Sequence, residues 1–299
     1  MNNQHYLSYF NISWLSETDG PGTRMVLFLQ GCHLDCAWCH SPHSQPEKSP
    51  LLYFDALCKK CERCKTACKN DVHSFADGKH LLQRDNCIQC GECIKACPQS
   101  SPYKQSGALM LPTRRMDIDS LFEMIRPHLE ILKGNGGITF SGGEPLLQSD
   151  ALSELAKKCK ESGFHTALET SGIVTLSSIK DVYPFIDTWL IGLRLILGPD
   201  TTKNTFLENK TRETLSFLAR DLKKEIIARI PVIPGFTTTE SYLEKVRKLL
   251  LDYPIKKVEF LPHNPESSHY YQAMGLSPRI EYQATEADSK YDYVSNYFN

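Results

Sequence analysis

Three cysteines, Cys32, Cys36 and Cys39, stand close together with three and then two residues between them. A short turn with this spacing brings thiolates to one centre, as an iron–sulfur cluster requires. A cubane cluster takes four ligands, so three cysteines leave one iron with an open position. An open iron can bind a chelating ligand and pass it one electron. The alternative is a structural zinc site that takes His33 or His40 as its fourth ligand.

Eight further cysteines form two runs with the same rhythm of two, two and three intervening residues. This is the bacterial two-cluster ferredoxin pattern, in which the fourth cysteine of each run ligates the other run's cluster. Paired zinc knuckles are the alternative, although zinc does not favour this rhythm. The first run ends in Cys68-Lys69 where the pattern has Cys-Pro, which alters the turn without removing a ligand. The pattern predicts one cluster on Cys58, Cys61, Cys64 and Cys97 and another on Cys87, Cys90, Cys93 and Cys68.

Alternating strands and helices must position the first three cysteines. A strand over Met25–Leu29 leads to Cys32, and beyond residue 117 amphipathic helices alternate with short apolar strands. Repeated βα units predict a parallel sheet with crossover helices and a reactive site at the carboxyl ends of the strands. The predicted strands are Gly136–Phe140, Phe164–Leu168, Thr188–Leu193, Glu225–Ile230 and Lys257–Phe260, and the predicted helices are Asp119–Leu132, Ser149–Ser162, Lys210–Leu222 and Glu240–Leu251.

The number of these units, about six, predicts an α/β fold of a particular kind: an incomplete, TIM-like parallel (β/α)6 barrel. The cysteine-rich stretch loses the long periodicity and is rich in Pro, Lys and Gln, which indicates an inserted module. We expect the barrel and its cysteine loop to begin in residues 1–48. A bacterial ferredoxin-like 2[4Fe-4S] domain follows in 49–107, and the rest of the barrel in 108–299.

The composition argues against several other classes of protein. The 299 residues carry a net charge of -1. The chain therefore lacks the surplus of basic residues that would indicate a nucleic-acid partner. The apolar stretches are too short or interrupted to span a bilayer, and the N-terminus does not resemble a secretion signal. Eleven of the twelve cysteines lie between positions 32 and 97, with a regularity that disulfides would not require. We therefore expect a cytoplasmic protein without membrane partners.

The residues around the first cysteines resemble those of a known family. Asp19–Arg24 (Asp-Gly-Pro-Gly-Thr-Arg), Phe28–Cys32 and Cys36–His40 are similar to the activating enzymes of glycyl radical enzymes, in the radical S-adenosylmethionine superfamily. The resemblance implies that the open iron binds S-adenosylmethionine, which is cleaved reductively to a 5′-deoxyadenosyl radical. The radical abstracts hydrogen from a glycine of a partner glycyl radical enzyme, and a flavodoxin or ferredoxin supplies electrons. Trp38 matches the aromatic residue near the adenine.

The resemblance also assigns ligand contacts beyond the cysteine loop. Gly142, Gly143 and Glu144 match a Gly-Gly-Glu motif that holds the amino group of S-adenosylmethionine. Their alternative role is a strand-to-helix turn with Glu144 near a helix N-terminus, where a carboxylate is favoured. Glu169 and Arg229 match strand-end positions that face the ligand, and Arg229 could pair with its carboxylate. A strand-edge ion pair is the alternative for Arg229.

The sequence departs from the family at two places. Gly192 and Arg194 stand where the family carries Asp and Lys. The carboxylate is therefore absent, and the cation is a forked guanidinium instead of an ammonium. Asn264 falls at the position of the family's ligand-side His, and a shift of one residue would place His263 there.

Two other functions stay open at this point. One is a radical S-adenosylmethionine enzyme acting on a small molecule or on another protein residue. The other is a non-catalytic ferredoxin-like electron carrier. With three [4Fe-4S] clusters, one binding S-adenosylmethionine and two auxiliary, the chain would hold about twelve irons.

Overall fold

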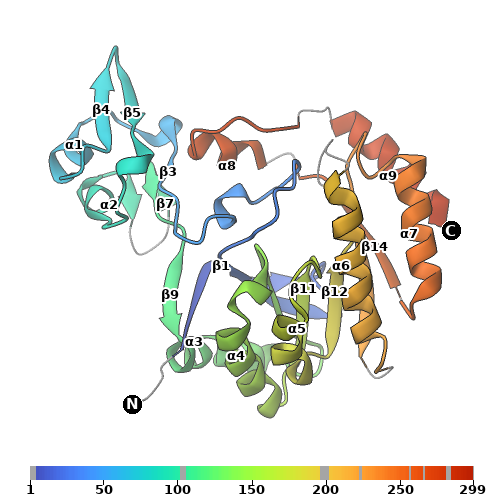
Figure 1. The fold of residues 1–299 in the computed structure, drawn as a ribbon. Coiled ribbons are helices and arrows are strands. Elements are labelled where there is room, and N and C mark those ends of the chain that lie inside the picture. The colour runs from blue at the N-terminus through green and yellow to red at the C-terminus, as the bar shows by residue number, and fades with distance from the viewer. Residues whose placement is uncertain are drawn as a thin grey trace.

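An eight-stranded sheet forms the centre of the computed structural model (Figure 1). The model describes residues 5–101, 106–195, 202–221, 224–255, 257–264, 267–280 and 284–298. The strands follow the spatial order β14-β13-β12-β11-β10-β2-β1-β9. Their bounds are β1 Tyr6–Ser16, β2 Thr23–Leu29, β9 Arg114–Asp117, β10 Gly136–Gly142, β11 His165–Thr170, β12 Thr188–Gly192, β13 Glu225–Val232 and β14 Lys257–Pro262.

The sheet is mostly parallel. Strands β2 and β10 to β14 pair in parallel with one another, whereas β1 pairs antiparallel with both β2 and β9. The register places Gly142 opposite Leu29 and Gly192 opposite Arg229. Segments far apart in the sequence therefore end together at one edge, as parallel strands require.

Helices connect the parallel strands and bury apolar residues against them. Helix α3 begins after Asp117, whose side chain accepts a hydrogen bond from the Ser120 amide. Its buried residues recur at helical spacing and join the main core. In Figure 1, α4, α5 and α6 lie side by side over the sheet. The helices are α3 Ile118–Leu132, α4 Ser149–Glu161, α5 Leu176–Val182, α6 Thr202–Leu218, α7 Glu240–Asp252, α8 Ser267–Ala273 and α9 Ala284–Phe298.

The cysteine-rich stretch between β2 and β9 forms a separate small lobe, at the upper left of Figure 1. It has its own apolar cluster, which includes Leu51, Val72 and Ile94. Strands β3 and β8 pair where the chain leaves and re-enters the larger body. The elements of this lobe are β3 Leu52–Tyr53, α1 Arg63–Ala67, β4 His73–Ala76, β5 Lys79–Leu82, α2 Glu92–Ala96, β6 Ser100–Ser101, β7 Ser106–Gly107 and β8 Leu109–Met110, with short 3-10 turns at Asp55–Leu57 and Arg84–Asn86.

The expected strands and helices are all found, with ends shifted by a few residues. Helix α6 begins at Thr202, eight residues before the predicted Lys210, and Leu222 lies outside the described residues. In the main body, the strands β1 and β9 and the helices α5, α8 and α9 were not predicted. In the described ranges, no helix is long and apolar enough to cross a membrane.

Candidate active site and cysteine sites

The loop with Cys32, Cys36 and Cys39 lies across the carboxyl ends of the parallel strands. The Cys39 amide donates to the Cys36 carbonyl at 3.1 Å, which closes a tight turn. The Cys32 amide donates to the Gln45 carbonyl at 3.0 Å and so fixes the start of the loop. The loop packs in an apolar cluster with residues that follow β11 and β13, namely Ile173, Ile233 and Phe236.

Cys36 is buried and Cys32 and Cys39 are partly buried, and this burial governs the ionisation of the three thiols. It raises the pKa of Cys32 to about 12 and those of Cys36 and Cys39 to about 11. The guanidinium of Arg194 acts in the opposite direction on all three thiols. Metal binding therefore displaces protons here, and a cation already lies beside the anions that remain.

The histidines of the zinc alternative are not arranged as a fourth ligand. His33 Nε2 lies 2.7 Å from the Ile173 carbonyl oxygen. Among the described residues, the three cysteines and these two histidines form no set whose donor atoms all lie within 4.8 Å of one another. Three thiols without an imidazole partner suit a cluster with one open iron better than a four-coordinate zinc ion.

Gly142 and Gly143 let the end of β10 touch the cysteine loop. The Glu144 amide donates to the Gly31 carbonyl at 2.8 Å. A Cβ on Gly143 would lie 2.2 Å from the Gly31 oxygen and 3.1 Å from the Cβ of Cys32. A Cβ on Gly142 would lie 2.3 Å from the Leu29 amide nitrogen. Only glycine permits this approach, so the motif and the first cysteine form one unit.

Glu144 is buried, and both of its oxygens are used within the protein. Oε1 accepts from the Thr170 hydroxyl at 2.7 Å and from the Leu146 amide at 3.3 Å. Oε2 accepts from the Ser171 amide at 2.9 Å and the Ser171 hydroxyl at 2.6 Å. The turn role expected as the alternative is therefore present, and the carboxylate ties the end of β10 to the end of β11.

Arg229 is the centre of a buried charge network. Its Nη1 lies 3.1 Å from Glu169 Oε1 and 3.4 Å from Asp19 Oδ1, and its Nε lies 3.0 Å from Glu259 Oε2. The group also donates to the Thr18 carbonyl. Burial alone would lower the pKa of Arg229, but the three carboxylates raise it above its ordinary value. The ion pair expected as the alternative is therefore present as well.

Glu169 connects this network to the end of β10. Its Oε2 accepts a hydrogen bond from the Ser141 hydroxyl at 2.7 Å. Burial would raise its pKa, yet Arg229, Ser141 and Arg194 together hold it below the ordinary value. An ionised Glu169 thus lies between two guanidinium groups.

Arg194 and Gly192 act as a pair. A Cβ on Gly192 would lie 2.7 Å from Arg194 Nη1, so the guanidinium folds over the space that a side chain would fill. Burial alone would lower the pKa of Arg194, but Cys36, Glu169, Cys32 and Cys39 raise it. The two departures from the family thus combine to place a cation between the thiols and Glu169.

Trp38, His263 and Asn264 have different surroundings. The Trp38 ring is buried with its centroid 5.7 Å from that of Phe236. His263 is partly buried just beyond β14, and burial and the nearby His40 lower its pKa. Asn264 is exposed. His263 is thus close enough to His40, the residue after Cys39, for the two imidazoles to interact.

The cysteines of the small lobe line two cavities. The first is bordered by Cys58, Cys61, Cys64 and Cys97, and the second by Cys68, Cys87, Cys90 and Cys93. Each cavity thus takes its fourth thiol from the other run. Among the described residues, no set of these thiols alone is compact enough to hold a single metal ion. The donor sets fit two cubane clusters better than paired zinc ions.

Several contributing residues were missed by sequence reasoning. Asp19 and Glu259 pair with Arg229 across separations of 210 and 30 residues, and nothing local indicates these contacts. His73 and His80 lie beside the cysteines of the small lobe. A short hairpin with two histidines between two cysteine runs was the available signal for them.

Proteins with similar sequences are named as activating enzymes. A family model described as a 4Fe-4S single cluster domain matches residues 18–105. An isethionate sulfite-lyase activating enzyme of Desulfovibrio desulfuricans is 31% identical over 89% of this chain and 86% of that protein. A 4-hydroxyphenylacetate decarboxylase activating enzyme of Clostridioides difficile is 31% identical over 85% and 80%. An indoleacetate decarboxylase activating enzyme of Tractidigestivibacter scatoligenes is 26% identical over 96% and 92%.

Solved structures give weaker matches. A domain of pyruvate-formate lyase-activating enzyme from Bacteroides vulgatus has a TM-score of 0.39 and 22% identity, covering 55% of this chain and 95% of that one. A radical SAM methyltransferase from Sphaerobacter thermophilus has a TM-score of 0.44 and 14% identity, covering 89% and 69%.

Proposed function

Because this chain belongs to the activating enzymes of glycyl radical enzymes, in the radical S-adenosylmethionine superfamily, we propose that it holds three [4Fe-4S] clusters. When bound, the first cluster supplies the electron that cleaves S-adenosylmethionine to a 5′-deoxyadenosyl radical. This radical abstracts hydrogen from a glycine of a partner glycyl radical enzyme. The relatives cited are activating enzymes, which favours this function over an electron carrier or an enzyme acting on a small molecule.

The first cluster is assigned to Cys32, Cys36 and Cys39. The observation that carries this assignment is the close approach of Gly143 to Cys32, since it brings the Gly-Gly-Glu motif beside the cysteines that would hold a cluster with one open iron. Gly142 and Gly143 offer backbone atoms to S-adenosylmethionine, while Glu144 holds their turn in place. Trp38 covers the cluster loop and excludes water.

The charged residues hold the ligand site in a fixed arrangement. Arg229 holds Glu169 ionised and fixed, and Arg194 places a positive charge between Glu169 and the thiols. We assign Arg194 to the ligand's carboxylate side, because Arg229 already has three carboxylate partners. His263 contacts the ligand from the end of β14, and the exposed Asn264 contributes less.

The two other clusters occupy the cavities of the small lobe. Support comes from their linings, which match the crossed ligand sets of two-cluster ferredoxins. On this basis residues 49–107 are a ferredoxin-like insert, and residues 1–48 and 108–299 form an incomplete (β/α)6 barrel. We assign the chain to the reducing cytoplasm, where cysteines stay reduced and available to clusters.

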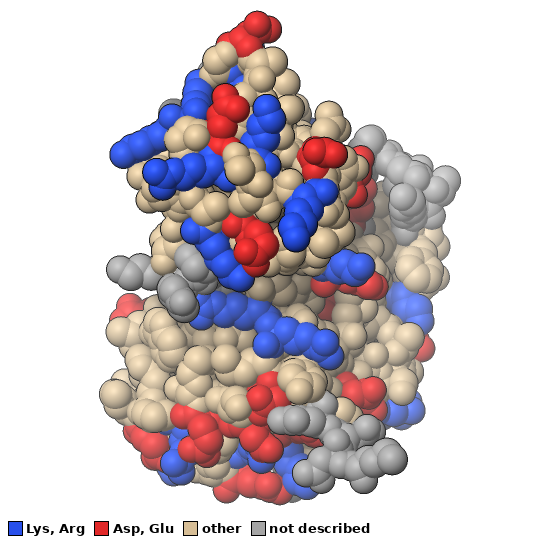
Figure 2. Space-filling model, turned by 90° about the vertical axis from the view of Figure 1, so that its left-hand side faces the viewer, with Lys and Arg blue, Asp and Glu red and all other residues tan. Residues whose placement is uncertain are grey.

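Electrons enter at the second of these cavities, the one bordered by Cys87, from a larger hollow that Cys87 also lines. Figure 2 shows the hollow between the two lobes, crossed by basic side chains. The hollow has a volume of about 630 Å³ and is lined by Cys87, the exposed Ile88, Lys48, Arg114 and Arg115. A flavodoxin or ferredoxin with an acidic face would be attracted to this rim.

Iron and sulfide counts on the reconstituted protein test the assignment. We expect about twelve irons per chain, and about eight when Cys32, Cys36 and Cys39 are all changed to Ala. That variant should form no 5′-deoxyadenosine. Cys159→Ala is the matched control, since Cys159 is buried in the main core away from the three sites. A wild-type protein that forms no 5′-deoxyadenosine with reductant, or a partner that gains no glycyl radical by electron paramagnetic resonance, would contradict the function.

A further inference from the structure

Helix α8 lies between the small lobe and the loop of the first three cysteines, and it contacts both. In Figure 1 it lies beside the small lobe. It packs against β3 of that lobe and against the 3-10 turn η1, Pro42–Ser44, which follows Cys39. Its residues, Ser267–Ala273, come from the last part of the chain, so these contacts exist only in the tertiary structure.

Arg84 of the small lobe holds one end of α8. Its Nη2 donates to the Ala273 carbonyl, 189 residues away, at 2.8 Å. Its Nε donates to the Leu51 carbonyl at 3.2 Å, and its own carbonyl accepts from the Cys87 amide at 2.9 Å. Leu51 and Cys87 both line the second cysteine cavity. Arg84 therefore joins two walls of that cavity to the last residue of α8.

Gly275 leaves room for this guanidinium. Its φ of +73° ends α8 in the left-handed conformation that glycine favours. A Cβ at this position would lie 2.6 Å from Arg84 Nη1, where ordinary contact begins at 3.4 Å. The guanidinium is the flexible partner and would have to move. The contact between Arg84 and the end of α8 can therefore be disturbed from either side.

The segment 267–280 is also attached to the loop of the first three cysteines. Tyr270 of α8 stacks on His43 of η1, with the ring centroids 4.1 Å apart. Beyond α8, Arg279 forms an ion pair with Asp35, which lies between the first two of these cysteines. One segment thus connects a wall of the second auxiliary site to the site of the first cluster.

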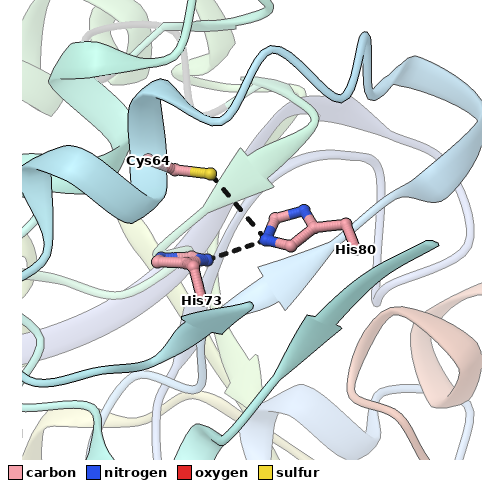
Figure 3. A group of neighbouring side chains, drawn as sticks. All are labelled: Cys64, His73 and His80. Carbon is pink, nitrogen blue, oxygen red and sulfur yellow. Dashed lines mark hydrogen bonds between the residues drawn. The ribbon is translucent and has the colours of Figure 1, made fainter. Parts of the chain in front are cut away.

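The histidine hairpin of the small lobe lies on another side. Strands β4 and β5 point away from the larger body in Figure 1. On them, His73 Nδ1 and His80 Nε2 lie 2.9 Å apart beside Cys64 (Figure 3). These contacts stay within the lobe, whereas the contact of Arg84 with Ala273 crosses to the larger body. Arg84 is therefore the residue to examine for a role between the two lobes.

We propose that Arg84 is a positioning residue for electron transfer from the second auxiliary cluster to the first cluster. The inference rests on the cluster sites of the proposed function. By binding both Cys87 and α8, Arg84 holds the second auxiliary site at a fixed separation from the cysteine loop that α8 also contacts. Electron transfer through protein slows steeply with distance. A lobe that moves away from α8 should therefore deliver its electrons more slowly.

The electrons in this step can be counted. One electron leaves an auxiliary cluster, which is oxidised, and the first cluster gains it and is reduced. The same electron then passes to the sulfonium of S-adenosylmethionine, whose carbon–sulfur bond breaks to give methionine and the 5′-deoxyadenosyl radical. Each electron delivered therefore releases one methionine, which can be measured without knowing the partner enzyme.

The test is a turnover without free reductant. The holoenzyme is fully reduced with dithionite, desalted and mixed with S-adenosylmethionine. The electron already on the first cluster should give a first phase of about one methionine per chain, and the auxiliary electrons a second phase of up to about two. Electron paramagnetic resonance of samples frozen during the reaction shows which cluster has been oxidised.

Arg84→Ala should keep the first phase and slow the second. A hydrogen bond from a charged donor contributes about tenfold to the docked arrangement, so we expect the second phase to slow by about tenfold. Gly275→Ala should act in the same way, because its Cβ displaces the guanidinium. The double variant should be no slower than Arg84→Ala, since both changes disturb one contact. Arg84→Lys keeps a charged donor and should retain most of the rate.

Gly134→Ala and Gln272→Ala are the matched controls. Gly134 also follows a helix with a positive φ, +89°, but nothing lies within 4 Å of a new Cβ. Gln272 is exposed on α8 itself. Both controls should leave the two phases unchanged. A redox titration should give wild-type potentials in all variants, so that a slower second phase reports distance. A shifted potential that accounts for the slower phase would overturn the positioning role.

The remaining outcomes separate this inference from the proposed function. Equal slowing of both phases in Arg84→Ala, or a wild-type second phase in both Arg84→Ala and Gly275→Ala, overturns the inference. So does a wild-type protein that gives the first phase alone, although cleavage itself then stands. A wild-type protein that releases no methionine contradicts the proposed function. Where Arg84→Ala does not fold, Gly275→Ala provides the test, because it leaves every side chain of the small lobe in place.

Discussion

Replacing Gly143 with Ala should lower the rate of S-adenosylmethionine cleavage by about 100-fold while leaving the protein folded. The new Cβ would lie 2.2 Å from the Gly31 oxygen, where ordinary contact begins at 3.4 Å. The end of β10 and the cysteine loop must therefore separate by about 1.2 Å. A displacement of about 1 Å in a catalytic arrangement lowers a rate by about 100-fold. Overpacking of this kind costs about 1–3 kcal/mol of folding stability.

The assay is 5′-deoxyadenosine formation by reconstituted protein with dithionite, together with iron content and thermal unfolding. Gly78→Ala is the control, because Gly78 has a φ of +70° and nothing within 4 Å of a new Cβ. It should cost about 1–2 kcal/mol through backbone strain alone. Both variants should thus lose similar stability, but only Gly143→Ala should lose activity. Wild-type turnover in Gly143→Ala would refute the argument that this contact aligns the motif with Cys32.

Three further predictions concern charge. Gly192→Ala should push the Arg194 guanidinium away from the thiols, and Arg194→Ala should remove its charge. Each of these two variants should lower the reduction potential of the first cluster, measured by redox titration. Arg194→Lys keeps the charge and should retain most of the wild-type potential. Arg229→Ala leaves three carboxylates without their cation and should reduce the free energy of unfolding by about 3–5 kcal/mol in a denaturant titration, and an unchanged stability would show that the network is not structural. Arg115→Glu should slow reduction by an acidic donor protein in stopped-flow measurements at low salt while dithionite-driven cleavage is unchanged, and equal slowing with both reductants would exclude a docking role.

Local sequence was sufficient for much of the fold and for the cysteines. Cluster ligands with two or three residues between them are brought together by a single turn, so Cys32, Cys36 and Cys39 could be predicted as ligands without the fold. The parallel strands were found because strands buried on both faces are continuous apolar runs. Strand β1 was missed because polar residues interrupt it, and it pairs antiparallel at the side of the sheet.

The roles of individual charged and polar residues depended on tertiary structure. Arg229 meets Asp19 only because the register of the sheet brings residues 210 positions apart to one edge. Gly192 and Arg194 looked like separate losses in the sequence, whereas one makes room for the other in the structure. His73 and His80 become a pair through the turn of a hairpin and the packing of two cavities against it. The sequence by itself determined which residues we propose as iron ligands, because that assignment depends on short spacings. Which groups surround these cysteines depends on long-range packing, and only the tertiary structure decided it.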